Sequence, residues 1–218
     1  IKYNINVDNV DFVLMPSKKV ATKIVAHNEK DGSDASIDLS ENDLVFITNG
    51  SMTEASGYGD NDTAAPLITS EEGGVWNLWK NIAEQSEEFG HPEKFCGHIE
   101  ETNWESATIT YNSEEITQYV EKITKRSPYT GKIVTGGIVT VIDSNWLMSW
   151  TINRQPQYLG QPKDNVEVWT YGLFSDKAGD YIKKQMRDCT GEEIAKEWLY
   201  QIGVPTSDID RLVKSCNT

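Results

Sequence analysis

Short apolar runs and turn residues dominate the beginning of the chain, a pattern typical of β-strands. Apolar residues at positions 7–14 begin a strand, residues 20–26 return after a Pro-Ser-Lys-Lys turn, and residues 35–39 form a short third strand. Residues 44–47 are continuously apolar and lead into Thr-Asn-Gly-Ser, which suits a strand buried on both faces of a sheet. The pattern predicts a β-meander followed by one buried strand.

Helices and further strands are predicted in the rest of the chain. Residues 52–74 are rich in Gly, Asp and Asn and predict a long loop, the kind of loop that is often functional. Thr190 and Glu193 have the spacing of a capping box at the start of a helix. Helices are expected at residues 75–88, 114–125, 190–202 and from 207 to the end, and strands at 106–110, 132–142, 146–152 and 166–174. This order indicates an α+β fold, or an α/β fold of which only part is present.

Composition narrows the class of protein. The 218 residues carry a net charge of −14, which argues against nucleic acid as a partner of the whole chain but leaves room for a local basic patch. The three cysteines, Cys96, Cys189 and Cys216, are widely spaced, so we expect neither a disulfide framework nor a zinc site. No run of 18 apolar residues is present, and a cytoplasmic location is the default expectation.

Two segments carry candidate chemistry. The apolar run that ends near Ser51 places backbone amides at the carboxyl edge of a sheet, where open α/β sheets bind dinucleotides. The chain contains no GxGxxG, so any phosphate loop would precede Ile1, and a strand followed by a Gly turn is common in other settings. The cofactor interpretation therefore stays open on these residues alone.

The second segment follows an apolar strand. If the extended backbone continues, Thr151, Asn153, Gln155 and Gln157 share one face that can hold a carboxylate, and Arg154 points the other way. The alternative is a polar edge strand in solvent. The seven Trp residues are core residues in the simplest interpretation, and several of them suit the wall of a lipid pocket.

Ordered motifs along nearly the whole chain give the sequence a family resemblance. They lie at residues 42–51, 92–96, 103–108, 134–142, 144–156, 160–164, 171–174 and 197–200. The chain resembles the oleate hydratases of the myosin-cross-reactive antigen family, which bind FAD and add water to the cis double bond of oleate and related acids to give 10-hydroxy fatty acids. The resemblance implies that residues 1–74 are part of a Rossmann-type FAD-binding domain, a β-meander plus its last parallel strand. It implies that residues 75–218 belong to a mixed α+β domain that binds the fatty-acid substrate.

The same resemblance assigns individual roles. Val7 is expected near the adenine of FAD, and Asn49, Gly50 and Ser51 are expected to line the cofactor. Thr151 and Asn153 match positions that hold the substrate carboxylate, and Gln157 stands where the family commonly has His. Gln157 offers a neutral donor in place of a cation, which predicts weaker carboxylate capture or a shifted substrate preference.

The family's glycine-rich loop and catalytic Glu and Tyr are expected before Ile1, so no catalytic residue is assigned here and the chain alone is expected to be inactive. An unsaturated fatty acid, a homodimer partner and peripheral membrane contact are the partners that the resemblance implies. The alternatives are a flavin- or lipid-binding module without catalysis, a divergent relative, and a folded piece without activity of its own.

Overall fold

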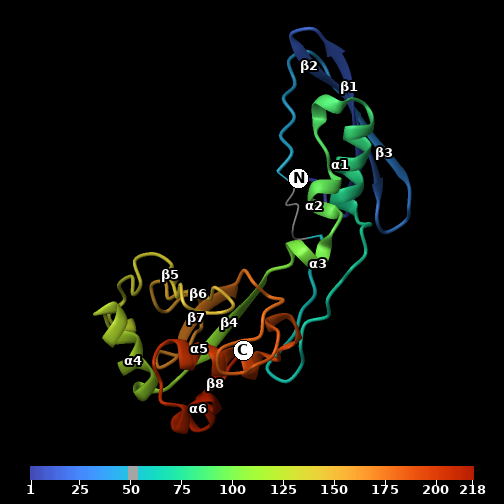
Figure 1. Cartoon of the computed structure of the whole chain (residues 1–218). Coiled ribbons are helices and arrows are strands. Elements are labelled where there is room, and N and C mark those ends of the chain that lie inside the picture. The colour runs from blue at the N-terminus through green and yellow to red at the C-terminus, as the bar shows by residue number, and fades with distance from the viewer. Residues whose placement is uncertain (49–53) are drawn as a thin grey trace. The chain divides into compact units, whose positions relative to one another are not determined.

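The computed structural model describes residues 1–48 and 54–218, and the chain forms two compact units (Figure 1). One unit consists of Ile1–Ser56 and Ile68–Thr102, and the other consists of Gly57–Leu67 and Asn103–Thr218. Both contain an antiparallel sheet with helices packed beside it, and no two described strands pair in parallel. The predicted α+β class is confirmed for the described residues.

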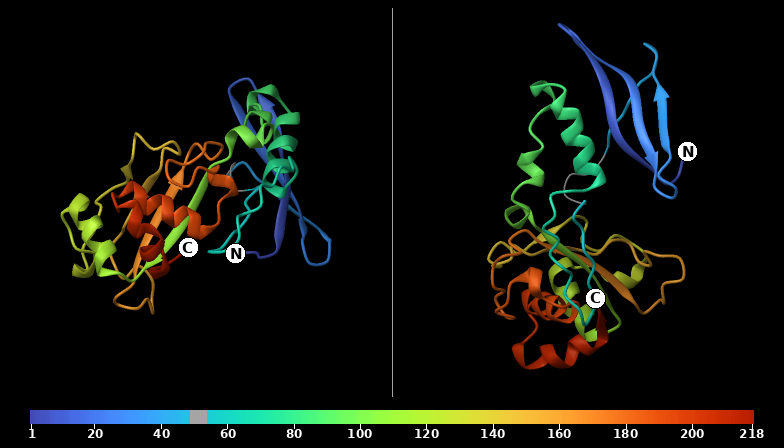
Figure 2. Two further views of the ribbon diagram at one scale, coloured as in Figure 1. Left: turned by 60° about the horizontal axis from the view of Figure 1, so that its bottom comes forward. Right: turned by 90° about the vertical axis from the view of Figure 1, so that its right-hand side faces the viewer.

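The first unit is a three-stranded meander with a helix against it. Strands β1 (Ile5–Met15), β2 (Lys18–Asn28) and β3 (Asp34–Asp38) pair in sequence order, as predicted. Helix α1 (Gly74–Glu84) packs on β1 through a small cluster of Val10, Leu78 and Ile82. Two short helices, α2 (Glu93–Cys96) and α3 (Ile99–Thr102), follow it, and Figure 2 shows this part of the chain from two further sides.

Polar side chains of α1 and of its C-cap residue Gln85 form hydrogen bonds with backbone groups at the free edge of β1. The Asn81 amide donates to the carbonyl of Asp8 at 2.8 Å, and the Gln85 amide donates to the carbonyl of Val10 at 2.9 Å. Gln85 Oε1 also accepts from the backbone amide of Phe12 at 3.0 Å. An edge strand otherwise exposes such groups, so these bonds explain why the helix joins the meander. The first unit therefore extends past residue 74, the predicted domain boundary, and includes Ile68–Thr102. The functional roles assigned to the two predicted domains stay predictions.

The prediction of a buried strand at residues 44–47 is wrong for this chain. The structure has no strand there, and the side chains of Leu44 and Phe46 are each 81% exposed. A continuous apolar run becomes a buried strand only when other strands flank it and both faces are covered. Among the described residues no strand pairs with this segment.

The second unit contains a five-stranded antiparallel sheet in the order β5-β6-β7-β4-β8. Its strands are β4 (Glu105–Tyr111), β5 (Val139–Thr140), β6 (Ser149–Thr151), β7 (Val166–Gly172) and β8 (Cys216–Asn217). Its helices are α4 (Glu114–Thr124), α5 (Gly191–Gln201) and α6 (Thr206–Leu212). Short 3-10 turns lie at Glu87–Phe89 in the first unit and at Pro128–Thr130, Met186–Asp188 and Val213–Ser215 in the second.

Helix α5 supplies the centre of the core of the second unit. Trp198 is fully buried, and its ring centroid lies 5.9 Å from that of Tyr111 and 6.1 Å from that of Trp150. The predicted capping box is confirmed, since Thr190 Oγ1 accepts from the Glu193 amide and the Glu193 carboxylate accepts from the Thr190 amide. These bonds satisfy amides that the helix itself leaves unpaired.

Three predicted elements differ in extent from those in the structure. The strands predicted at residues 132–142 and 146–152 shorten to β5 and β6, and Gly136, within the first of them, has a φ of 71° that is incompatible with an extended strand. The last helix stops at Leu212 instead of running to the end, because Cys216 and Asn217 pair with β4. The conformation of Cys216 and Asn217 is set by backbone hydrogen bonds to a strand that is distant in sequence. The local periodicity of the sequence does not predict such pairing.

Candidate functional site

One face of the five-stranded sheet is polar and aromatic, and it is incompletely covered. Along β7, Val166, Val168 and Thr170 face the core, whereas Trp169 and Tyr171 alternate with them and are half-buried. The strand register places Thr151 of β6 and Thr108 of β4 on either side of Trp169. Residues paired across strands share a face, so these hydroxyls flank the indole. We call the surface formed by Trp104, Thr108, Thr151, Trp169 and Tyr171 the outer face.

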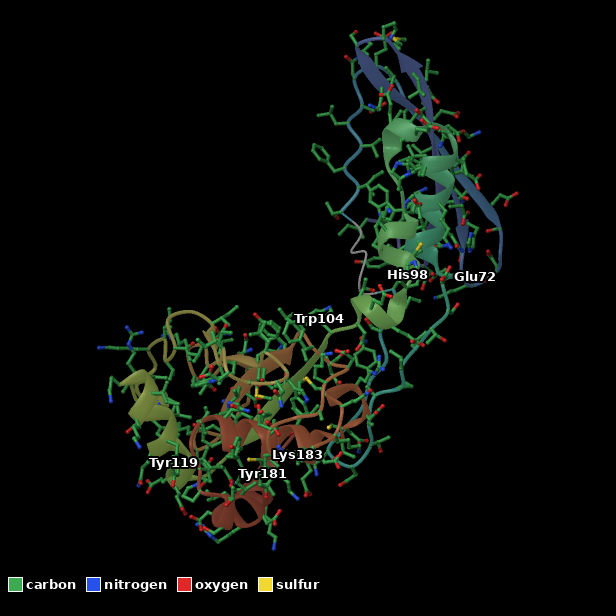
Figure 3. All side chains as sticks on the ribbon, viewed as in Figure 1. Glu72, His98, Trp104, Tyr119, Tyr181 and Lys183 are labelled. Atoms are coloured by element: carbon green, nitrogen blue, oxygen red, sulfur yellow. The ribbon has the colours of Figure 1, made fainter. Side chains whose placement is uncertain are left out.

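Three aromatic rings form a continuous row on the outer face. The ring centroids of Trp169 and Tyr171 are 4.9 Å apart, and those of Trp104 (labelled in Figure 3) and Tyr171 are 5.9 Å apart with the rings nearly perpendicular. All three side chains are half-buried. Trp76, Trp146, Trp150 and Trp198, in contrast, are fully buried and belong to the cores. An aromatic row bordered by hydroxyls offers both apolar contact and hydrogen bonds to an amphiphilic ligand.

Thr151 is already part of a hydroxyl pair. Its Oγ1 lies 2.8 Å from Oγ1 of Thr135 and donates to the carbonyl of Gly137 at 3.2 Å. Thr135 Oγ1 also lies 3.3 Å from both the amide and the carbonyl of Ile152. Both hydroxyl protons therefore have internal acceptors. A carboxylate that binds here must draw the Thr151 proton away from Gly137, which the bond to a charged acceptor favours.

The segment after β6 is held by the buried amide of Gln155. Its Oε1 accepts from the Gln161 side chain at 2.7 Å and from the Glu167 amide at 3.1 Å, and its Nε2 donates to carbonyls of Asn153 and Glu167. The prediction that Gln155 shares a polar face with Thr151, Asn153 and Gln157 is wrong, because the strand ends at Thr151 and Gln155 is 5% exposed. The extended backbone on which that prediction depended does not continue.

Asn153 and Gln157 remain available to a ligand. Both side chains are exposed, and the Gln157 amide donates to the Tyr158 hydroxyl at 3.2 Å. No hydrogen bond links Thr151, Asn153 and Gln157 to one another, all three being described. The segment thus presents neutral donors to solvent, following in sequence on Thr151 of the outer face.

Arg154 is exposed and lines an open hollow of about 850 Å³. The other lining residues are Lys125, Arg126, Ser127, Thr130, Gly131, Lys132 and Ile133. Four of these eight residues are cations, and none is acidic. We call this surface the basic hollow.

Two buried carboxyl groups, those of Glu105 and Glu197, were not predicted from the sequence. Burial, with a smaller contribution from the charge of Asp188, raises the pKa of Glu105 from 4.5 to about 7, and its buried Oε2 has no hydrogen-bond partner within the described chain. Glu197 is fully buried and accepts from the amides of Asp180, Tyr181 and Ile182 at 2.9–3.0 Å (Tyr181 is labelled in Figure 3). With 34 acidic residues in the chain, no sequence signal distinguishes these two from a solvated surface.

Comparison with known proteins places the sequence in a family. The model of the MCRA family matches residues 1–218, the whole chain. The chain belongs to the MCRA family. It is 44% identical over 213 residues to a protein named oleate hydratase from Streptococcus pyogenes serotype M49 (strain NZ131), a match that covers 97% of this chain and 36% of the relative.

A second relative carries a similar name. The MCRA-family chain is 26% identical over 191 residues to a protein named linoleate hydratase from Lactiplantibacillus plantarum, and that match covers 86% of this chain and 33% of the relative. The chain therefore spans about a third of the length of the curated relatives it matches.

Val7 is the described residue among those predicted to contact the cofactor in this MCRA-family chain. Asn49, Gly50 and Ser51 lie outside the described residues. Val7 pairs with Ala26 in the meander, is half-buried, and packs against the cluster that contains Val10 and Leu78. The exposed part of this side chain suits an apolar contact with the rim of a flat ring.

Other features of the MCRA-family chain concern metals, thiols and membranes. Cys96, Cys189 and Cys216 are free thiols, and burial raises the pKa of both Cys189 and Cys216 to about 12. Within residues 1–48 and 54–218, no cluster of three or more His, Cys, Asp or Glu side chains is arranged to hold a metal ion. The helices of that same part of the chain are all too short or too polar to cross a membrane.

Proposed function

We propose that this chain works as part of a fatty-acid hydratase that adds water across the cis double bond of oleate-like acids and forms 10-hydroxy acids. The match of the whole chain to the MCRA family carries the proposal, and the names of the two relatives supply the reaction. The outer face supports it, because an aromatic row that ends at neutral hydrogen-bond donors suits an acyl chain with a carboxylate head.

In this proposal, Thr151, Asn153 and Gln157 receive the substrate carboxylate. Asn153 and Gln157 have exposed amide donors, and Thr151 has a hydroxyl on the outer face. Water adds its hydrogen to one alkene carbon and its hydroxyl to the other, so the protein must supply and recover one proton. We assign this proton transfer to no residue of the chain.

FAD is proposed as the cofactor, with Val7 in contact with the adenine and Asn49, Gly50 and Ser51 along the cofactor. Val7 supports only a peripheral contact, since its side chain is half-buried in the meander cluster. When bound, the flavin is expected to order the site without a net redox change. A cytoplasmic location, a homodimer and peripheral membrane contact remain predictions from the resemblance.

A segment exchange tests the reaction. The matched part of the Streptococcus pyogenes relative is replaced by this chain, and oleate, FAD and reductant are supplied while hydroxy acid is measured by mass spectrometry. Hydroxy acid from the hybrid, with none from the isolated chain, supports the proposal. A folded, FAD-loaded hybrid that makes no product would contradict it and favour a binding protein without catalysis.

Carboxylate capture is tested by oleate binding to the same hybrid. Thr151→Val and Asn153→Ala are each expected to weaken binding by about threefold to tenfold, since each removes one hydrogen bond to the ligand. Thr69→Val is the control, because Thr69 is exposed and is not part of the outer face. Equal losses from Thr69→Val and Thr151→Val would refute the assignment.

Gln157→His tests the departure from the family pattern. A protonated imidazole makes a charge-assisted bond in place of a neutral one, so oleate should bind about tenfold more tightly at pH 6 than to the unsubstituted hybrid. The gain should shrink at pH 8, where an ordinary imidazole is neutral. Equal affinities at pH 6 would show that position 157 does not contact the carboxylate.

A further inference from the structure

The basic hollow brings together cations from two separate segments. Lys125, Arg126 and Lys132 follow helix α4, and Arg154 follows strand β6. Figure 1 shows the end of α4 beside the segment that leads to β5, and a hydrogen bond of 3.4 Å from Arg126 Nη1 to the carbonyl of Ile133 joins them. The cations converge through the fold and not through a single run of basic sequence.

Two of the four cations have a structural explanation. Lys125 ends helix α4 in the left-handed conformation, with a φ of 58°, and its Nζ donates to the carbonyl of Lys122 at 2.7 Å. Such a cation stabilises the negative end of the helix dipole. Arg126 tethers the following loop through Ile133.

Lys132 and Arg154 have no such explanation. Both side chains are exposed, and neither forms a hydrogen bond or an ion pair from its side chain with any described residue. The chain contains 34 acidic and 20 basic residues, yet no carboxylate of the described part pairs with any of the four cations that line the hollow. A net charge of −14 makes a cluster without a counter-charge unexpected unless a ligand supplies one.

Neutral donors complete the lining. Ser127 Oγ accepts from the Tyr129 amide at 3.5 Å, which leaves its own proton for a ligand. Gly131 has a φ of 69°, a conformation that brings backbone close to the hollow without a side chain in the way. Guanidinium, ammonium and hydroxyl donors around one concave surface match the several oxygens of a phosphate group.

We propose that the basic hollow binds a phosphate group, either of a soluble phosphate ester or of a phospholipid headgroup. A singly charged carboxylate suits the neutral donors near Thr151 better, whereas four cations suit an anion with more charge and more acceptor oxygens. Ile133, which is 55% exposed in the same lining, gives an apolar contact to the group that carries the phosphate. This site does not depend on the proposed hydratase activity.

Binding to the 218-residue chain provides the test. Inorganic phosphate and glycerol 3-phosphate are titrated by calorimetry, and vesicles of phosphatidylglycerol or of phosphatidylcholine are tested by flotation. The double variant Lys132→Gln/Arg154→Gln removes the two cations that no described residue engages. The control Lys163→Gln/Lys214→Gln changes the net charge equally at two exposed positions away from the lining.

Saturable binding that weakens about tenfold in Lys132→Gln/Arg154→Gln and stays unchanged in the control is the expected result. Binding of the two small phosphates alone would identify a soluble ester, and flotation only with phosphatidylglycerol would identify a lipid headgroup. The proposal is overturned if none of the probes binds saturably, or if the control pair weakens binding as much as the hollow pair. Circular dichroism of both double variants verifies that they are folded.

Discussion

Glu105→Gln tests how much the ionisation of one buried carboxyl group lowers the free energy of unfolding of the second unit. Glu105 lies at the start of β4, its pKa is raised from 4.5 to about 7 mainly by burial, and Asp188 adds a smaller repulsion. The folded chain therefore prefers the protonated form. Below pH 4.5 both the folded and the unfolded chain hold this proton, and its titration does not change the free energy of unfolding.

The cost appears as pH rises. Between pH 4.5 and 7 the unfolded chain releases the proton and the folded chain keeps it, so stability falls by about 1.4 kcal/mol per pH unit. Above pH 7 the cost is constant at about 3 kcal/mol, an order-of-magnitude value from the shift. Glu105→Gln removes the titration, but the new amide adds donors beside an atom that already lacks a partner. That penalty of about 1–3 kcal/mol is independent of pH.

The measurement is urea unfolding of both chains at pH 5 and pH 8, followed by tryptophan fluorescence. The free energy of unfolding of Glu105→Gln relative to the unsubstituted chain should rise by about 2–3 kcal/mol from pH 5 to pH 8. Glu101→Gln, at an exposed helical position, is the control and should show no such rise. A difference for Glu105→Gln that is the same at both pH values would refute the reasoning.

Three further changes test the architecture. Glu197→Gln places an amide against backbone donors of the segment that contains Tyr181, so the free energy of unfolding should fall by about 3 kcal/mol. Glu192→Gln, which breaks a half-exposed ion pair with Lys196, should lower it by less than about 1 kcal/mol. Gln155→Leu should raise amide hydrogen exchange across residues 153–167, because it leaves Gln161 and the Glu167 amide without their acceptor; unchanged exchange there would contradict the role of Gln155. Native Cys189 should resist maleimide at pH 7 and react after denaturation, because burial raises its pKa to about 12; rapid labelling of the native chain would count against its burial.

Local signals in the sequence predicted those elements whose stabilising contacts are close in sequence. The capping box of Thr190 and Glu193, the meander turns and the two amphipathic helices of 75–88 and 114–125 all depend on residues within a few positions. Leu44 and Phe46 show the opposite case, since an apolar run specifies burial but not which strands provide it. The pairing of Cys216 with Tyr111 joins residues that no local pattern connects.

The candidate site was predicted in part for the same reason. The family resemblance singled out Thr151 and Asn153, and the register of β6 against β7 then added Trp169 as a neighbour of Thr151. The prediction that Gln155 and Gln157 share a face with Thr151 was wrong, because it assumed that the strand continued to Gln157, whereas it ends at Thr151. The burial of Gln155 has a three-dimensional cause, namely its bonds to Gln161 and Glu167, and no spacing in the sequence encodes it.

Gln155 also explains how one short segment serves two surfaces of opposite character. Its buried amide fixes the backbone between Thr151, which belongs to the outer face, and Arg154, which lines the basic hollow. The outer face offers neutral donors and an aromatic row, which suit a carboxylate with an apolar tail. The basic hollow offers cations, which suit the more highly charged phosphate.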